Sequence, residues 1–328
     1  MSLNWGILGP GRIAHRFATA LTQGTDGKLI AVASRNEQRA SEFAAQFAAE
    51  RYYTQYSALV EDGGIDVIYI ATPHNFHFEQ AMMCLHAGKH LLIEKPICMN
   101  AAQAQKIADL AAQKNLFVME AVWSRFLPSC QQAMDWLIQG EIGELRAIDS
   151  SICFAFDKGD EHRTFNKALA GGALLDLGIY SVNLSQWFAK ANPVNIGAMA
   201  KIGHTGVDNI LMTNMRYTNG VMAQFTTAME AHSSNYLLLQ GSKGTIELQQ
   251  MFWAGHKVTL TNDDKTICMD LPHAVNGFEY QIQEVQRCIK NNETYSNVMP
   301  ITDTLANMQV MDEIRRQIEL DYGELEHS

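Results

Sequence analysis

Three residues of this chain have side chains that together could take a proton from an alcohol: Lys95, Asp176 and Tyr180. Lys95 follows the apolar run of residues 90–93 and Glu94, and it precedes a proline. Asp176 and Tyr180 are four residues apart, so on a helix they share one face. A free tyrosine has a pKa near ~10, and a neighbouring ammonium lowers that pKa towards the range of a useful base. The three residues therefore predict acid–base chemistry on a hydroxyl group.

Each of these features also has a simpler structural interpretation. The tripeptide Glu94-Lys95-Pro96 is ordinary loop chemistry. Asp176 could cap the N-terminus of a helix, with Tyr180 as a half-buried aromatic residue. The catalytic interpretation depends on a cofactor that takes the electrons, and a second motif supplies it.

Residues 9–14 have the pattern G-x-G-x-x-A and lie between an apolar run and a helical pattern. Gly9 permits a tight turn, and Gly11 lets a pyrophosphate approach the backbone. The N-terminus of the following helix then presents free N–H groups to the phosphates. The position at the start of a strand–helix–strand unit predicts dinucleotide binding, with contacts from Gly9, Gly11, Arg12 and Ile13.

The second apolar run ends at Ser34 and Arg35, where NAD-selective proteins usually carry an acidic residue. Arg35 can neutralise a 2′-phosphate, Ser34 can hydrogen-bond to it, and Arg39 can add charge or cover the adenine. We expect NADP to be preferred over NAD. The alternative is that Arg35 is only a solvated loop residue.

The first third of the chain alternates apolar runs with helical patterns. Apolar runs without polar alternation are buried on both faces, which predicts a parallel sheet covered by helices. We therefore expect a doubly wound α/β domain, a Rossmann domain, over residues 1–122. The expected strands are residues 4–9, 28–34, 66–71, 90–93 and 116–119, and the expected helices are residues 12–23, 40–49, 76–87 and 101–114.

The pattern changes after Trp123. Strand-like stretches follow one another, and Asn-Gly and Lys-Gly pairs join them as in hairpins. We expect an α+β domain over residues 123–328, with an open, mostly antiparallel sheet and an acidic, solvated tail at 319–326. Its expected strands are residues 145–156, 194–201, 209–217, 221–228, 236–240, 245–249 and 257–261, and its expected helices are residues 131–139, 277–290 and 303–318.

Composition excludes several classes of function. The chain has 328 residues, 47% hydrophobic and 18% charged, which is a globular balance. Its net charge of −10 disfavours general nucleic-acid binding. The six cysteines form no C-x-x-C pair, which predicts reduced thiols in a cytoplasm. We see no secretion signal, no apolar run near the ~18 residues of a membrane span and no histidine spacing typical of a metal site.

Together these elements resemble the Gfo/Idh/MocA family of sugar and polyol oxidoreductases over nearly the whole chain. Many members of that family have Asp-x-x-x-His where this chain has Asp176 and Tyr180, which weakens any transfer of inositol or glucose–fructose chemistry. The chain resembles instead the branch of trans-1,2-dihydrobenzene-1,2-diol dehydrogenase and NADP-dependent D-xylose dehydrogenase. The motifs that carry the resemblance are residues 9–14, 72–77, 94–96, 120–126, 171–180 and 311–315, with Arg163.

The resemblance implies that Lys95 and Tyr180 flank the reacting hydroxyl, with Tyr180 as proton acceptor and Asp176 orienting the pair. It implies a homodimer or higher homo-oligomer through the open sheet. For the nicotinamide half of the cofactor it implies contacts from Thr72, Pro73, His77, Glu94, Lys95 and Trp123, and for the substrate it implies contacts from Arg163, Phe154 and Phe156.

We therefore expect an NAD(P)-dependent dehydrogenase acting on a hydroxyl-bearing carbon of a sugar, polyol or cyclic diol. The reductive direction would use the same residues. The alternative is a non-catalytic NADP-binding sensor or partner-binding protein on the same fold, and the presence of Lys95, Asp176 and Tyr180 argues against it.

Overall fold

The computed structural model describes residues 2–326, which divide into two compact units. The first unit holds residues 2–123 and 274–304, and the second holds residues 124–273 and 305–326. The first boundary falls one residue after the expected one. Residues 274–304 were expected in the second domain but belong to the first unit. The helical pattern of 277–290 identifies a helix, and it carries no information on which elements that helix packs against.

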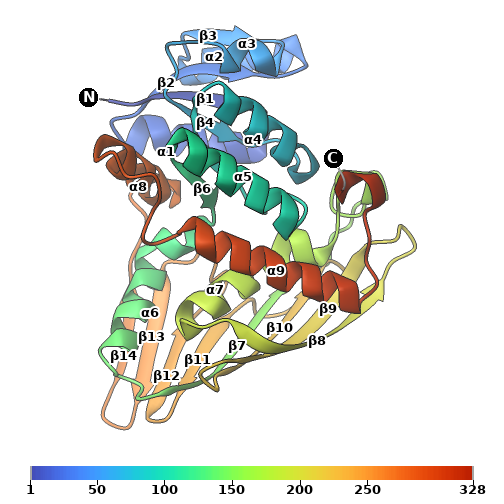
Figure 1. The fold of residues 1–328 in the computed structure, drawn as a ribbon. Helices are drawn as coiled ribbons and strands as arrows, with labels where there is room; N and C mark the ends of the chain where they lie inside the picture. Colours follow the sequence, from blue (N-terminus) through green and yellow to red (C-terminus); the bar gives the residue numbers. More distant parts are fainter. Residues whose placement is uncertain (1, 327–328) are drawn as a thin grey trace. The chain divides into compact units, whose positions relative to one another are not determined.

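The first unit contains a six-stranded sheet in the order β3-β2-β1-β4-β5-β6 (Figure 1). Every neighbouring pair is parallel, and the order is that of a doubly wound dinucleotide-binding fold. This confirms the Rossmann prediction. The strands are β1 (Asn4–Leu8), β2 (Lys28–Ala33), β3 (Arg51–Tyr53), β4 (Val67–Ile70), β5 (His90–Glu94) and β6 (Val118–Ala121).

A late helix of the chain packs against the first helix of this unit. A side chain at Gly24 would meet the Glu279 Cβ at 2.9 Å, so the glycine allows the two helices to approach closely. The Gln283 amide donates to the Gly24 carbonyl oxygen at 3.0 Å, and Lys290 pairs with Asp26 at 2.8 Å. The helices are α1 (Arg12–Gly24), α2 (Glu37–Phe47), α3 (Tyr56–Val60), α4 (His77–His86), α5 (Ala101–Lys114) and α8 (Phe278–Lys290).

The second unit contains an eight-stranded sheet in the order β14-β13-β12-β11-β7-β10-β9-β8. Its neighbours are antiparallel except β7 and β10, which run parallel, so the sheet is mostly antiparallel as expected. The strands are β7 (Leu145–Cys153), β8 (Pro193–Ile202), β9 (Asp208–Tyr217), β10 (Met222–Ala228), β11 (Leu237–Gly241), β12 (Gly244–Leu248), β13 (Lys257–Asn262) and β14 (Thr266–Asp270).

Helices cover one face of this second sheet (Figure 1). They are α6 (Pro128–Ile138), α7 (Ile179–Ala189) and most of α9 (Ile301–Gln317). Along β9, buried Leu211, Thr213, Met215 and Tyr217 alternate with exposed residues, the pattern of a strand with one covered face. The opposite face is open and carries three methionines that are 74%, 51% and 49% exposed: Met199, Met212 and Met222.

One stretch of this unit, Lys167–Ala189, is long and apolar enough to cross a membrane, which we did not anticipate from the sequence. In its most apolar window 83% is buried inside the protein, as in a core helix, so it is weak evidence for a span. The acidic end of the chain also departs from expectation. Leu320 and Tyr322 are buried, so the described part of this segment packs on the second unit instead of fraying into solvent.

Candidate active site

The glycine loop joins β1 to α1 in the first unit. Gly9 has φ +88°, and a Cβ there would lie 2.9 Å from the Thr72 Cγ2 at the end of the neighbouring strand β4. A Cβ on Gly11 would meet no atom within 4 Å, so the backbone faces open space at this point. The first turn of α1 has neither a capping side chain nor an acidic residue. The loop therefore fits a pyrophosphate at the helix N-terminus.

Basic residues lie at the end of β2, where an adenosine ribose would bind. Ser34 is buried and its hydroxyl accepts a hydrogen bond from the Asn36 amide at 3.2 Å. Arg35 and Arg39 are exposed, and the Arg35 guanidinium lies 5.5 Å from the centre of the Phe76 ring. Arg12 is exposed as well, and Ile13 is half-buried. The exposed cations can reach a phosphate in solvent, which is the chemistry expected for NADP.

His77 connects the loops that follow β4 and β5. Its Nε2 lies 2.8 Å from the Thr72 carbonyl oxygen and its Nδ1 lies 3.0 Å from the Pro96 carbonyl oxygen. Burial lowers the pKa of His77 to about 4, so the ring is neutral near pH 7 and donates to one carbonyl at a time. The Lys95–Pro96 peptide bond is cis. His77 therefore braces the backbone beside Lys95, and its expected contact with the nicotinamide stays a prediction.

Two buried carboxylates flank Lys95 in the first unit. Glu94 accepts a hydrogen bond from the Tyr69 hydroxyl and one from the Lys95 amide at 3.3 Å. Glu120 accepts from the Ile97 amide at 3.0 Å. These bonds fix the backbone on both sides of Lys95, whose side chain is half-buried. Thr72 is buried and donates to Gln80, and Pro73 is exposed.

Trp123 lies in an aromatic and cationic cluster that the sequence did not reveal. Its ring centre is 4.6 Å from that of Phe278, and the Arg16 guanidinium lies 5.1 Å from the Trp123 ring and 5.2 Å from the Phe278 ring. Arg16 belongs to α1, directly after the glycine loop. The three residues are far apart along the chain, so no local spacing announced them.

The segment with Asp176 and Tyr180 belongs to the second unit. Leu174–Gly178 forms a π-helical turn that leads into α7, a helix that is absent from the expected elements. Such turns are often found at functional sites. The Asp176 carboxylate lies 3.1 Å from the Arg163 guanidinium, so the two residues form an ion pair within this unit. The structure thus brings together two residues that the sequence placed in different roles.

A row of aromatic rings begins at Tyr180, which is 8% exposed. The Trp253 ring centre lies 6.2 Å from that of Tyr180 and 5.7 Å from that of Phe154. Phe154 in turn stacks on Phe156 at 5.6 Å. Trp253 was missed by the sequence analysis, although an adjacent Phe-Trp pair between two expected strands was a usable signal. The row of rings can form one wall of a substrate site in this unit.

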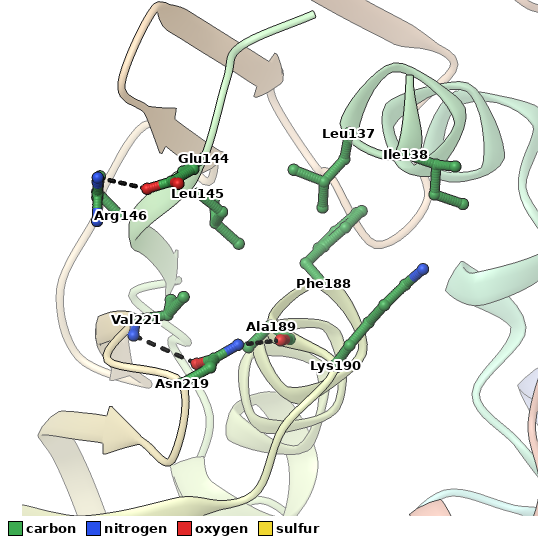
Figure 2. A pocket seen from close by; sticks show the side chains of 10 residues that line it. All are labelled: Leu137, Ile138, Glu144, Leu145, Arg146, Phe188, Ala189, Lys190, Asn219 and Val221. Atoms are coloured by element: carbon green, nitrogen blue, oxygen red, sulfur yellow. Dashed lines mark hydrogen bonds and ion pairs between the residues drawn. The ribbon is translucent and has the colours of Figure 1, made fainter. Parts of the chain in front are cut away.

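A cavity of about 410 Å³ lies at the C-terminal end of α7 (Figure 2). Tyr180 belongs to the N-terminal end of the same helix. Phe188 and Leu137 form its apolar side. Its polar groups bind one another: Glu144 pairs with Arg146, and Asn219 donates to the Ala189 carbonyl oxygen. Since none of the expected site residues lines it, this cavity is separate from the candidate active site.

No group of three or more His, Cys, Asp or Glu residues within 2–326 is placed to hold a metal ion. Lys95 lies in the first unit and Tyr180 in the second. Their convergence on one hydroxyl remains a prediction, and so do the expected contacts to cofactor and substrate.

Comparison with known protein families identifies the fold in both parts of the chain. Residues 3–122 match an oxidoreductase family described as having an NAD-binding Rossmann fold, and residues 130–247 match the GFO/IDH/MocA C-terminal domain. The chain belongs to the Gfo/Idh/MocA oxidoreductase family. It is accordingly an NAD(P)-dependent oxidoreductase that acts on hydroxyl-bearing carbons, as the sequence motifs predicted.

Individual relatives of this family member cover its whole length. Trans-1,2-dihydrobenzene-1,2-diol dehydrogenase from Mus musculus is 34% identical over 97% of both chains, and the enzyme of that name from Bos taurus is 32% identical over 100% of both. The 3-ketoreductase KijD10 from Actinomadura kijaniata, solved with NADP and TDP-benzene, is 27% identical with a TM-score of 0.88, covering 97% of this chain and 98% of that one. Aldose-aldose oxidoreductase from Caulobacter crescentus, at 22% identity and a TM-score of 0.89 over 97% of this chain and 98% of that one, shares the fold.

Proposed function

We propose that this protein is an NADP-preferring dehydrogenase that oxidises a secondary hydroxyl on a six-membered ring, either a cyclic diol or a sugar. The observation that carries this substrate class is the row of rings formed by Tyr180, Trp253 and Phe154. Flat apolar surfaces suit the face of a carbocycle or the C–H face of a sugar. The relatives named diol dehydrogenase and the 3-ketoreductase support the same two substrate classes.

The chain's own residues would manage the proton while the cofactor manages the electrons. When bound, the nicotinamide ring accepts the hydride that leaves the carbinol carbon. Tyr180, as its phenolate, would take the hydroxyl proton while the C–O bond becomes a carbonyl, and Lys95 would donate a hydrogen bond to the same oxygen. Asp176, whose carboxylate pairs with Arg163, would orient the pair, as the family resemblance implies. The resemblance to the family assigns the transfer of the hydroxyl proton to these same two residues, Lys95 and Tyr180.

Preference for NADP is supported by the end of β2. Ser34, Arg35 and Arg39 offer a hydroxyl and two cations, and no carboxylate stands at the position that usually binds the ribose of NAD. The structurally similar 3-ketoreductase KijD10 was solved with bound NADP.

The experiment is a screen of pentoses, hexoses, inositols and cyclic diols with NADP and with NAD, following absorbance of the reduced cofactor. Lys95→Ala and Tyr180→Phe should each lower kcat by at least about 100-fold, the size of one acid–base contribution. NADPH affinity, measured by fluorescence, should remain within a few fold. Tyr295→Phe, at an exposed tyrosine, is the matched control. Unchanged rates in Tyr180→Phe would exclude the assignment, and cofactor binding without turnover on any substrate would favour the sensor alternative.

We also propose a homodimer through the open face of the second sheet. Met199 and Met212 face each other across β8 and β9, and Met222 lies on the same face, so exposed apolar surface gathers there. Light scattering should give twice the monomer mass, and Met212→Glu should restore the monomer. Five of the six cysteines are buried free thiols, which supports the proposal of a reducing, cytoplasmic location; cell fractionation tests the location. We propose a role in carbohydrate metabolism from the resemblance to sugar and polyol oxidoreductases.

A further inference from the structure

The turn that precedes the Asp176–Tyr180 segment is held by residues far away in the chain. Gly171 and Gly172 form this turn, and both are crowded. A Cβ on Gly171 would lie 2.6 Å from the Thr164 carbonyl oxygen, and a Cβ on Gly172 would lie 2.1 Å from the Asp208 Oδ1. Gly172 has φ +131°, which other residues rarely adopt. Both positions of the turn therefore require glycine, because the atoms that pack on it leave no room for a side chain.

Asp208 takes the place of the missing helix cap. The π-helical turn Leu174–Gly178 has no capping side chain of its own at its N-terminus. Asp208, the first residue of β9, is fully buried, and its Oδ2 accepts the Leu174 amide hydrogen at 2.7 Å.

Tyr322 holds the other side of the turn. It is 5% exposed, and its hydroxyl donates to the Gly171 carbonyl oxygen. A Cβ on Gly172 would lie 2.9 Å from this hydroxyl, so Tyr322 and Asp208 pack on the same glycine. The Tyr322 amide donates to Glu326 at 2.9 Å, and buried Arg315 pairs with Glu326 and with Asp312. These contacts fix the chain around Tyr322 on the second unit.

We propose that Asp208 and Tyr322 are positioning residues that set the place of Asp176 and Tyr180. The inference rests on the proposed function, because it assigns a purpose to the geometry of that reacting segment. A displacement of about 1 Å of a reacting group can cost about 100-fold in rate, so a held turn has a large effect on turnover. Neither residue touches Asp176 or Tyr180 in the contacts described above, and both act through the backbone.

The test compares Asp208→Ala, Asp208→Asn and Tyr322→Phe with Asp264→Asn and Tyr295→Phe, two changes of the same kind at exposed positions. For each variant, titration with NADPH measures the concentration of folded protein that binds the cofactor. Amide hydrogen exchange over residues 171–180 then reports the turn itself, and kcat, KM and the pH dependence of kcat report the reacting groups. A merely structural role would lower the amount of enzyme without moving the pH profile.

We expect exchange over residues 171–180 to rise about fivefold to tenfold in Asp208→Ala and Tyr322→Phe, as for the loss of one buried hydrogen bond. We expect kcat per folded enzyme to fall about 10- to 100-fold, its pH profile to shift, and NADPH affinity to stay constant. Asp208→Asn keeps an oxygen for the Leu174 amide and should recover most of kcat.

Exchange, kcat and pH profile equal to those of the controls would overturn the proposal. If Asp208→Ala does not fold, Tyr322→Phe decides alone, because it removes one oxygen atom from a residue that keeps its ring. Suppose that exchange rises in the variants but the natural protein oxidises no hydroxyl substrate. That result would support the role of Asp208 and Tyr322 in holding the turn and would reject the proposed function. Normal turnover with unchanged variants would reject the anchored turn only.

Discussion

The Arg163 guanidinium lies 3.1 Å from the Asp176 carboxylate, and both residues belong to the same unit. The Arg163 side chain is 48% exposed, so the ion pair adds at most about 1 kcal/mol to stability. Its larger effect is on the direction of the Asp176 carboxylate, four residues before Tyr180 in the chain. We expect Arg163→Gln to lower kcat/KM about tenfold, as for a loosened positioning contact.

A double-mutant cycle with Asp176→Asn measures this coupling. The unfolding temperature of Arg163→Gln should stay nearly constant. The control Arg146→Gln breaks an exposed ion pair with Glu144 and should change neither kcat/KM nor the unfolding temperature. Additive effects of Arg163→Gln and Asp176→Asn would show that the pair acts separately.

The two loop glycines should respond differently to alanine. At Gly9 the positive φ and the contact with Thr72 make a Cβ costly, so Gly9→Ala should destabilise the protein by about 1–3 kcal/mol. At Gly11 the Cβ enters open space, so Gly11→Ala should fold normally and lose NADPH affinity. Thermal unfolding and fluorescence titration separate the two effects. Normal NADPH affinity in Gly11→Ala would place the pyrophosphate elsewhere.

Arg35 should determine which nicotinamide cofactor is used. Arg35→Asp replaces a cation by a group that repels a 2′-phosphate, so KM for NADP should rise about 10- to 100-fold while KM for NAD changes little or falls. Lys28→Asp makes the same change of charge at the opposite end of β2 and should leave the ratio unchanged. If both variants change the ratio of the two KM values equally, the effect comes from the net charge of the protein and not from a contact of Arg35 with the 2′-phosphate.

His77 should make the first unit sensitive to acid. Its pKa is about 4 in the folded state and near ~6.5 in the unfolded chain, because burial disfavours the charged ring. Below pH 6.5 the unfolded state therefore binds a proton that the folded state refuses. This group's contribution falls by up to about 3 kcal/mol as the pH drops from 6.5 to 4. Urea unfolding between these pH values should show a smaller loss for His77→Gln than for the natural protein, and equal slopes would contradict the assignment.

Asp208 should act in the opposite direction. Burial raises its pKa to about 7, whereas the unfolded carboxyl titrates near ~3.9. Between these values the folded state holds the proton, so this group lowers stability as the pH rises from about 4 to 7, by up to about 4 kcal/mol. Asp208→Asn should remove that part of the pH slope and Asp264→Asn should not. A slope that survives Asp208→Asn would assign it to another group.

The sequence sufficed for the parallel sheet because its strands are apolar without interruption, as in residues 90–93. It missed β3, whose three residues are half-buried or exposed, and β14, which alternates around exposed Cys268. The Gly9 loop and the Asp176–Tyr180 spacing were local signals and were found. Asp208 and Tyr322 were missed because they meet the reacting segment through contacts over 34 and 151 residues of chain.

Pairs of this kind leave no periodicity to detect. The same reason explains why Arg16 and Phe278 were missed beside Trp123, and why residues 274–304 were assigned to the wrong unit. Asp176 was found as a candidate, and its partner Arg163 was found as well, but only the structure shows that they pair.

The parallel pairing of β7 and β10 has a consequence for the order of folding. Parallel neighbours cannot be joined by a tight turn, so the chain from Cys153 to Met222 has to close on itself before this pair forms. The segment with Asp176 and Tyr180 lies inside that stretch. Because contacts between distant residues form slowly, we expect this pair and the segment that it encloses to form late in folding.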